Sequence, residues 1–289
     1  MTAIDFQSLM RQERQKSRKK ATEISLASAS EEKKSSSSSL PPSWRFQQPQ
    51  SLYSLKSFDS DLYHICSNPP DIYYVPNVLT CEFQRQISDW LLSLPENENP
   101  NQSCSSAAHS KWTPLRFGKR RVALFDKRIC PFPQPLALLA DYVDKSVWYE
   151  KQHESGESFI NHILINDYSS SDQGILPHTD GPAYEPCTAT LSLESDALLT
   201  FLPRGSNQNK SRIEDYPTLI LEPGSLVVFR DEAYAEWMHS IPTNQPCIDV
   251  DSRTCVNLSQ TKWAACSHQD EVSVQRGTRR ISLTFRVAR

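Results

Sequence analysis

The chain lacks a long hydrophobic run, and its 289 residues are poor in hydrophobic side chains overall. Hydrophobic residues make up 38% of the sequence, below the usual globular share, and the mean hydropathy is -0.55. No stretch approaches the length that a membrane-spanning helix needs, so we expect no membrane partner. The first residues are polar and charged and lack the apolar segment of a secretory signal, which predicts a soluble, intracellular protein.

The sequence also lacks any C-x-x-C pair among its eight cysteines. In a chain without a secretory signal, we expect these cysteines to be free thiols in a reducing compartment. The alternative is a zinc site formed by Cys255, Cys266 and His268, although their spacing fits no ordinary zinc finger.

An excess of positive charge is missing as well, because the formal net charge is -3. This excludes a surface that attracts nucleic acid over its whole area, so a polyanionic partner would have to meet a local basic patch. One basic run lies between Arg11 and Lys20. It fits a nuclear-import signal or a nucleic-acid-binding arm, and equally the exposed face of a short helix. We expect the protein in the nucleus and the cytoplasm.

The shortage of hydrophobic residues is concentrated near the N-terminus. Residues 1 to about 50 contain almost no large apolar run, and Ser35–Ser39 is a block of serine alone. Such a composition cannot bury enough surface to offset the entropy lost on ordering. We therefore expect a largely disordered extension over residues 1–70 and one folded domain over residues 71–289.

From residue 71 onward, helical and strand patterns predict a mainly β fold with flanking helices. A strand is expected at 72–76, a helix at 80–94 with Thr80 as its N-cap, and a second helix at 136–150. The polar stretch 243–277 is interpreted as a long insertion. Short alternating strands are expected at 159–166, 188–193, 197–202, 218–221, 225–229 and 280–287. Short strands after a helical start favour an antiparallel barrel or sandwich with helices packed on one side.

Two histidines and one carboxylate stand out in the second half of the chain: His178, Asp180 and, far downstream, His239. Residues two apart in a strand point to the same side, so His178 and Asp180 can reach one ion. We expect them at the end of one strand, with His239 on a later strand that returns alongside. Non-haem Fe(II) oxygenases use this ligand set and leave the other metal positions open. His162 lies in an apolar strand without such partners and is interpreted as structural.

A second pattern is the strand from Arg280 to Arg286, in which polar and apolar residues alternate. Its polar face carries Arg280, Ser282, Thr284 and Arg286. Two arginines flanking two hydroxyl groups can bind a dicarboxylate at both ends, because the planar guanidinium pairs bidentately with a carboxylate. The alternative is a half-buried strand with a solvated, charged face. Fe(II) oxygenases of this kind need a dicarboxylate co-substrate, which favours the binding interpretation.

Taken in order, these residues resemble the signature of the AlkB-type 2-oxoglutarate/Fe(II) dioxygenases. The signature is matched by Asn166-x-Tyr168, His178-x-Asp180, His239 and Arg280-x5-Arg286. Further likeness, closest to the homologue 6 subgroup, lies in Tyr74-Val75-Pro76, in Lys111-Trp112-Thr113 and between Pro177 and Tyr184. The resemblance covers roughly residues 70 to 289. It implies a double-stranded β-helix (jelly-roll) core and oxidative demethylation of N-alkylated bases in DNA or RNA.

The resemblance also implies a role for each residue of the signature. His178, Asp180 and His239 would bind Fe(II), and Asn166 and Tyr168 would hydrogen-bond the co-substrate 2-oxoglutarate, which reacts with O2. Arg280 would pair with the distal carboxylate of 2-oxoglutarate, and Arg286 would lie near the carboxylate that chelates iron. Ser282 and Thr284 would line the same pocket.

The chain departs from the subgroup in the segment that approaches the substrate. A Gln-Asn-Trp-Gly-Gly type run is usual there, whereas residues 120–128 read Arg-Arg-Val-Ala-Leu-Phe-Asp-Lys-Arg. We expect the basic side chains of segment 116–128, together with Lys111, to contact the phosphates of a methylated nucleic acid. Phe117 and Phe125 are expected to stack on bases. The alternative for this segment is a solvated lid that contacts no nucleic acid.

Two other functions share part of this pattern. The first is a 2-oxoglutarate oxygenase that acts on protein side chains, since several such families have His-x-Asp and a distal histidine. Many of those families use one basic residue for the distal carboxylate, so the paired arginines favour the AlkB type. The second is a nucleic-acid-binding or adaptor protein whose dioxygenase core turns over slowly or not at all.

Overall fold

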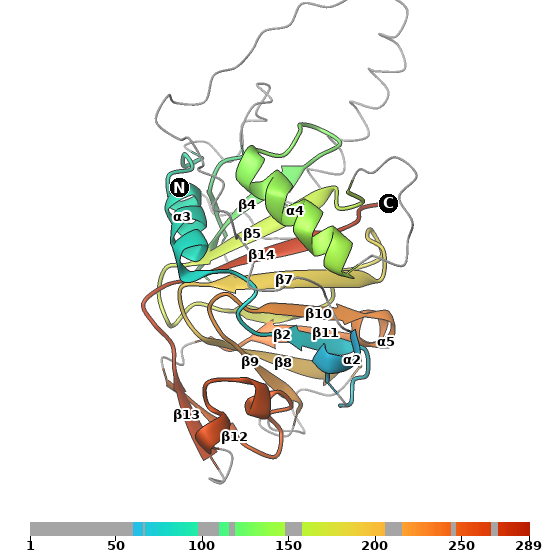
Figure 1. Ribbon diagram of the computed structural model, residues 1–289, viewed down its shortest axis with the longest axis vertical. Coiled ribbons are helices and arrows are strands. Elements are labelled where there is room, and N and C mark those ends of the chain that lie inside the picture. Colours follow the sequence, from blue (N-terminus) through green and yellow to red (C-terminus); the bar gives the residue numbers. More distant parts are fainter. Residues whose placement is uncertain are drawn as a thin grey trace, which may run out of the picture.

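Two antiparallel β-sheets form the centre of the domain (Figure 1). The computed structural model describes residues 60–65, 67–97, 110–115, 119–147, 158–205, 216–243, 247–266 and 271–289. The larger sheet has the strand order β1-β2-β10-β7-β14-β5-β4-β3 and the smaller one β6-β11-β8-β9. The strands of the larger sheet are β1 (His64–Ile65), β2 (Ile72–Val75), β3 (Thr113–Pro114), β4 (Arg121–Asp126), β5 (His162–Tyr168), β7 (Cys187–Leu193), β10 (Leu226–Arg230) and β14 (Arg280–Arg286). Those of the smaller sheet are β6 (Ile175–His178), β8 (Ala197–Pro203), β9 (Thr218–Leu221) and β11 (Trp237–Ile241).

The chain crosses repeatedly from one sheet to the other. It runs from β5 in the larger sheet to β6 in the smaller, back to β7, then through β8 and β9 to β10, β11 and β14. Every pairing between these strands is antiparallel. This winding is a double-stranded β-helix, or jelly roll, which confirms the expected fold class.

Helices cover the outer face of the larger sheet (Figure 1). These are α3 (Cys81–Leu92) and α4 (Gln134–Val147), whereas the short helices α2 (Ser60–Tyr63) and α5 (Asp231–Ala235) lie next to β2 and β10. Helix α3 begins as predicted after Thr80, whose Oγ1 accepts a hydrogen bond of 3.3 Å from the Phe83 amide. Its apolar face packs with α4 against strands β4, β5, β7 and β14. No described helix is long and apolar enough to cross a membrane.

The first described elements lie ahead of the domain boundary expected at Asp71. Helix α2 precedes β1, and β1 pairs with β2 at the edge of the larger sheet through His64↔Tyr73. This edge therefore includes residues from the segment that composition assigned to the extension. Residues 1–59, including the basic run and the serine block, lie outside the described residues.

The insertion at 243–277 covers the outer face of the smaller sheet (Figure 1). It contains a hairpin of β12 (Cys247–Asp251) and β13 (Glu271–Gln275) and two short 3-10 helices, η2 (Leu258–Gln260) and η3 (Ala264–Cys266). Apolar residues of the insertion pack on Leu198 of β8 and Ile220 of β9. The Asn257 side chain makes the hydrogen bonds that a neighbouring strand would make to β9. Its Oδ1 accepts from the Ile220 N–H at 2.9 Å, and its Nδ2 donates to the Ile220 carbonyl at 2.8 Å.

Candidate active site

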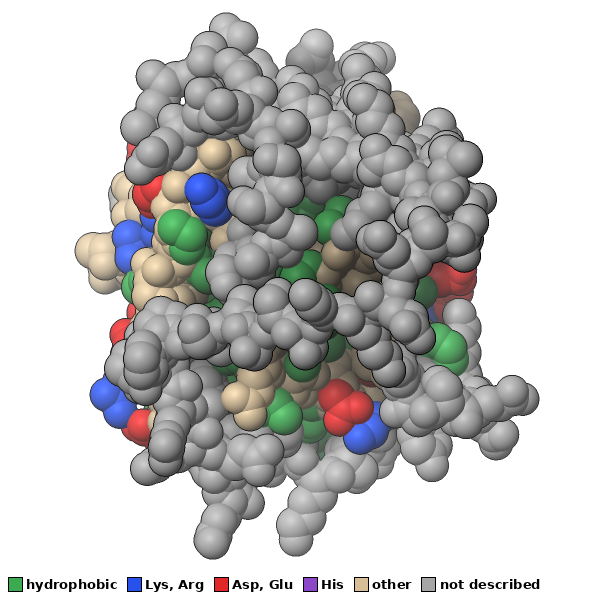
Figure 2. Space-filling view, turned by 90° about the horizontal axis from the view of Figure 1, so that it is seen from above, with side chains coloured by type: hydrophobic (Ala, Val, Ile, Leu, Met, Phe, Trp, Pro, Cys, Tyr) green, Lys and Arg blue, Asp and Glu red, His purple; other side chains and the backbone are tan. Residues whose placement is uncertain are grey.

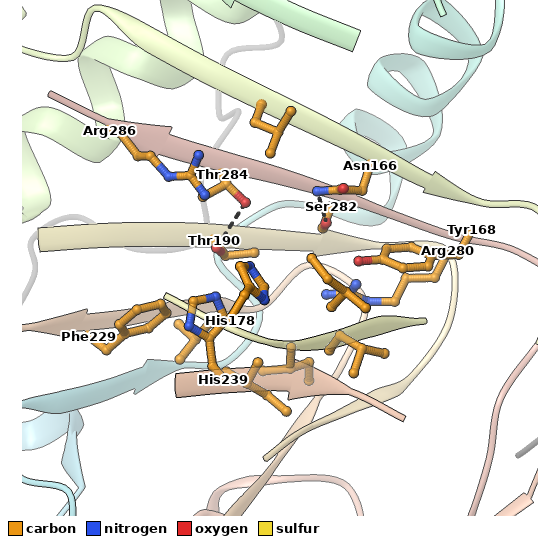
Figure 3. A pocket seen from close by; sticks show the side chains of 16 residues that line it. Asn166, Tyr168, His178, Thr190, Phe229, His239, Arg280, Ser282, Thr284 and Arg286 are labelled. Atoms are coloured by element: carbon orange, nitrogen blue, oxygen red, sulfur yellow. Dashed lines mark hydrogen bonds between the residues drawn. The ribbon is translucent and has the colours of Figure 1, made fainter. Parts of the chain in front are cut away.

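His178, Asp180 and His239 meet at the open edge of the smaller sheet. His178 ends β6 and lies directly opposite His239 on the neighbouring strand β11, as expected. The two rings are 4.3 Å apart between centroids, and Figure 3 shows both pointing into one pocket. One ligand atom from each of the three residues lies within 4.8 Å of the others. The fold thus brings together side chains that are up to 61 positions apart in the chain (239 − 178).

Both histidines are held in the form that binds metal. The Nδ1 of His178 lies 2.9 Å from the carbonyl oxygen of Leu176. A carbonyl only accepts, so Nδ1 carries the proton and Nε2 keeps its lone pair for a metal. Burial lowers the pKa of His178, and burial followed by the charge of His178 lowers the pKa of His239 to about 3. Neutral imidazole is the species that coordinates metal ions.

The third donor, Asp180, is held as an anion by Arg286 and Thr188. Burial alone would raise the pKa of its carboxyl group, but the charge of Arg286, the neighbouring histidines and the Thr188 hydrogen bond lower it to about 2. The Arg286 guanidinium donates to both oxygens, at 2.5 and 3.1 Å, and the Thr188 hydroxyl donates to Oδ2 at 2.7 Å. These bonds fix the orientation of the carboxylate beside the histidines.

This donor set fits Fe(II). Two neutral imidazoles and one carboxylate on one side of a pocket are the facial ligand arrangement of non-haem iron oxygenases. Among the described residues, no other group of three or more His, Cys, Asp or Glu side chains could hold a metal. For the alternative zinc site, burial raises the pKa of the Cys255 thiol to about 11, which disfavours the thiolate that zinc needs. The Cys266 side chain and His268 lie outside the described residues.

The second predicted pattern lines the same pocket. Strand β14 places four polar side chains along one wall, with Arg286 at the end near His178 and Arg280 at the far end (Figure 3). All seven residues of this strand are buried, so the alternative of a solvated, charged face is wrong. Its other face, with Ile281, Leu283 and Phe285, packs in the core under the helices.

Arg280 is a buried cation that has no carboxylate partner among the described residues. Its side chain is 2% exposed, its Nη2 donates to the Ser192 hydroxyl at 3.0 Å, and its Nε has no partner. The guanidinium lies 5.2 Å from the centre of the Tyr168 ring. Burial lowers the pKa of Arg280, although the neighbouring Tyr168 acts in the opposite direction. An anion in the pocket would compensate the charge of Arg280, because a buried charge is costly unless it is paired.

Asn166 and Tyr168 lie on β5, directly opposite β14. Asn166 pairs with Ser282 and Tyr168 with Arg280 in the strand register. The Asn166 amide lies 3.5 Å from the Ser282 hydroxyl (Figure 3). Eight of the nine predicted site residues therefore line one pocket, and the ninth, Asp180, is bonded to Arg286. They are Asn166, Tyr168, His178, His239, Arg280, Ser282, Thr284 and Arg286.

Sequence patterns missed other parts of the site. The pocket has an apolar wall to which Leu199, Leu221, Val227 and Phe229 contribute from strands of both sheets. Thr188 was expected in a strand, but no spacing rule could show that its hydroxyl reaches Asp180. Tyr184, also unassigned from sequence, presents its ring to the Arg286 guanidinium at 4.9 Å.

The structure corrects two expectations for the basic segment 116–128. Phe125 is 7% exposed and packs against Trp90 of α3, so it cannot stack on a base. Arg120 is 4% exposed and bonds to Asn166, so it does not face a phosphate at the surface.

The other basic residues of the segment differ in how free they are to bind a phosphate. Arg121 pairs with Asp167 and Glu96. Lys119 and Arg128 are exposed, and Arg116 and Phe117 lie outside the described residues.

Comparison with known proteins agrees with this site. Residues 71–286 match the family model of the 2OG-Fe(II) oxygenase superfamily, and the chain belongs to this family. It is a 2-oxoglutarate-dependent dioxygenase, and its family uses Fe(II), 2-oxoglutarate and O2.

Within the superfamily the chain is similar to a protein described as an AlkB homologue. It is 29% identical over 240 residues to the Danio rerio protein described as "Probable RNA/DNA demethylase ALKBH6", which covers 79% of this chain and 90% of the relative. Among solved structures it is similar to OsALKBH1, with a TM-score of 0.44, 14% identity, and coverage of 75% of this chain and 98% of that chain. It is also similar to an oxidoreductase of the 2OG-Fe(II) oxygenase family from Burkholderia pseudomallei, with a TM-score of 0.40, 14% identity, and coverage of 75% and 85%.

Proposed function

We propose that this enzyme removes alkyl groups oxidatively from the nitrogen atoms of bases in nucleic acid. The observation that carries the proposal is the similarity, over most of both chains, to a relative described as a probable RNA/DNA demethylase. The site is consistent with this, because an AlkB-type set of metal-binding and carboxylate-binding side chains lines one pocket.

In this proposal the two ends of the pocket have different tasks. His178, Asp180 and His239 bind Fe(II), with Asp180 oriented by Arg286 and Thr188. Bound Fe(II) supplies the oxygen-activating chemistry, in which 2-oxoglutarate is oxidised to succinate and CO2 and one oxygen atom enters a C–H bond of the N-methyl group. The resulting N-hydroxymethyl group breaks down to formaldehyde and the unmodified base.

The far end of the pocket binds the co-substrate. Arg280 pairs with the distal carboxylate of 2-oxoglutarate, which gives this buried guanidinium an anionic partner. Asn166 and Tyr168 hydrogen-bond the same molecule from β5, and Ser282 and Thr284 line its path. Arg286 would lie near the other carboxylate of 2-oxoglutarate, at the end of the pocket that holds His178. The apolar wall around Phe229 and Leu221 limits the access of water to the reacting atoms.

A nucleic-acid substrate would have to approach over a surface of mixed charge. On the face seen in Figure 2, a few described Lys and Arg side chains lie beside Asp and Glu side chains. Lys111 and Lys119 are exposed and could contact phosphates, with Lys119 Nζ 3.5 Å from Asp172, whereas Arg128 is paired with Asp126. The methylated base would leave its stack to enter the pocket.

The decisive experiment measures formaldehyde and succinate across a panel of methylated DNA and RNA oligonucleotides and methylated peptides. We expect formaldehyde release from one class of oligonucleotide, in equal amount to the additional succinate. The His178→Ala variant should lose both products, because one of three proposed iron ligands is removed. Turnover confined to peptides would instead favour an oxygenase of protein side chains. Oligonucleotide binding without succinate formation would favour the adaptor function.

A further inference from the structure

Arg120 is a buried charge outside the predicted site that contacts one of its members. It lies immediately before β4 and is 4% exposed. Its Nε donates to the Asn166 Oδ1 at 2.9 Å, and its Nη1 donates to the carbonyl of Gly174 at 3.2 Å. No carboxylate of the described residues lies within ion-pair distance, and burial lowers the pKa of its guanidinium. Burying a cation without an anionic partner costs free energy, so we looked for a function of Arg120 that would offset this cost.

The contact with Arg120 determines which way the Asn166 amide faces. A guanidinium group can only donate hydrogen bonds, so the atom of Asn166 that meets it must be the carbonyl oxygen. The NH2 group then points the other way, toward the Ser282 hydroxyl at 3.5 Å and into the pocket. In this orientation Asn166 offers the pocket a hydrogen-bond donor and no acceptor. A donor is the group that a carboxylate or keto oxygen of 2-oxoglutarate requires.

The other contact of Arg120 is to a tightly packed segment. Gly174 begins the approach to β6, and a side chain there would collide with the carbonyl oxygens of Ile241 and Pro242. A second buried arginine, Arg276, donates to the carbonyls of Gln173 at 2.8 Å and Pro242 at 3.0 Å. The anchor of Arg120 therefore has little freedom to move. A rigid anchor on one side fixes the guanidinium that orients Asn166 on the other.

We propose that Arg120 is a positioning residue for the co-substrate: it holds the Asn166 amide so that the NH2 group faces an oxygen of 2-oxoglutarate. Arg120 itself does not line the pocket and acts through Asn166. Its charge also lies 6.0 Å from the centre of the Tyr168 ring, whose other cationic neighbour is Arg280. This inference rests on the proposed contact between Asn166 and 2-oxoglutarate.

The test measures 2-oxoglutarate binding by calorimetry to the full-length protein loaded with Mn(II), which allows binding to be followed without turnover. Arg120→Met should raise the Kd for 2-oxoglutarate about tenfold, the usual effect of losing a hydrogen bond to a charged group. Asn166→Ala should raise it at least as much. The double variant should bind no more weakly than Asn166→Ala alone, because Arg120 acts through Asn166.

Turnover kinetics provide a second readout. Arg120→Met should raise the KM for 2-oxoglutarate while kcat at saturating 2-oxoglutarate stays near that of the wild type. Arg85→Met is the matched control, because Arg85 is an exposed arginine of α3 paired with Glu82. It should change neither Kd nor KM.

The outcomes distinguish the role of Arg120 from the role of Asn166. If Asn166→Ala weakens binding but Arg120→Met does not, or if their effects add, the positioning role of Arg120 is overturned and the role of Asn166 stands. If Asn166→Ala leaves the Kd unchanged, both are overturned.

Asn166→Asp keeps the test informative even if Arg120→Met does not fold. It gives Arg120 a carboxylate partner, so we expect a folded protein, but it replaces the presented NH2 group with an oxygen. Binding of 2-oxoglutarate should weaken tenfold or more, and an unchanged Kd would overturn the proposed orientation.

Discussion

The side chains around Asp180 hold its carboxylate in one orientation. Arg286 donates to both oxygens and Thr188 to one of them, all within a buried region. Replacing a residue that holds a metal ligand by hydrogen bonds typically lowers the metal affinity about 10- to 100-fold. Thr188 is the neutral member of this group, so it can be removed without changing the charge of the site.

Thr188→Val should weaken metal binding about tenfold to a hundredfold, because the carboxylate loses one of the bonds that orient it. Valine has nearly the same shape, so the packing of β7 is preserved. The measurement is a competition titration of Mn(II) with a chromogenic chelator. Thr254→Val, which removes a hydroxyl from the insertion, serves as the control. Equal affinities of Thr188→Val and wild type would show that Arg286 alone positions Asp180.

At the scale of single residues, residue type and order along the chain were enough to predict the site residues, but not the environment of the basic ones. His178, Asp180 and His239 were identified because metal ligands belong to few residue types, and Arg280 and Arg286 because a strand alternates. Arg120 was assigned to phosphate contact, since a row of basic residues looks the same whether it faces solvent or the interior. Only tertiary packing decides between these environments.

At the scale of elements, alternation predicted six strands that line the pocket (β5, β7, β8, β9, β10 and β14), whereas β6 and β11 were expected only as the places of His178 and His239. Strand β14 alternates strictly, and Thr80 with Phe83, Ile87 and Trp90 gives α3 both a cap and an apolar face. The elements of the insertion could not be predicted from the sequence, because its hairpin is polar on one side and its helices are only three residues long. The stabilising contact of Asn257 with Ile220 spans 37 positions and has no local signature.

Asn257→Ala should lower the free energy of unfolding by roughly 2–6 kcal/mol, since two buried backbone groups of Ile220 lose their partner and each costs about 1–3 kcal/mol. Urea unfolding of the variant checks this. Affinity for 2-oxoglutarate should be unchanged, because the insertion packs on the outer face of the smaller sheet. Gln275→Ala, at an exposed position of β13, is the control. A stability equal to wild type would mean that the Ile220 groups find other partners.

At the scale of the whole molecule, buried histidines couple stability to pH. Burial, followed by the charge of Arg286, lowers the pKa of His162 from 6.5 to about 3. Below pH 6.5 the unfolded chain binds a proton at this residue and the folded one does not, so stability falls as the pH falls. His162 contacts the Tyr184 hydroxyl at 3.4 Å, in agreement with its expected structural role.

His162→Gln should therefore lose less stability on acidification than the wild type. Between pH 7 and pH 5 the difference should be about 2 kcal/mol, at about 1.4 kcal/mol per pH unit below 6.5. Urea titrations of both proteins at the two pH values measure it. Parallel loss of stability in both proteins would contradict the low pKa of His162.

The exposed lysines near β4 offer a test of the nucleic-acid surface. Lys111→Gln with Lys119→Gln should raise the KM for a methylated oligonucleotide several-fold and reduce its dependence on salt concentration, because fewer phosphates are neutralised. The KM for 2-oxoglutarate should stay constant. Lys145→Gln removes an exposed lysine from α4 and serves as the control. An unchanged salt dependence would show that the substrate approaches elsewhere.

The coverage of β9 by the insertion has a consequence for self-association. An uncovered edge strand can recruit a strand from another molecule and so begin aggregation. Here Asn257 and the bridge between Thr218 and Cys255 occupy the edge of β9. The opposite edge, β6, carries Pro177, which has no N–H to donate to an incoming strand. Both edges of the smaller sheet thus resist intermolecular sheet extension, which disfavours self-association through either edge.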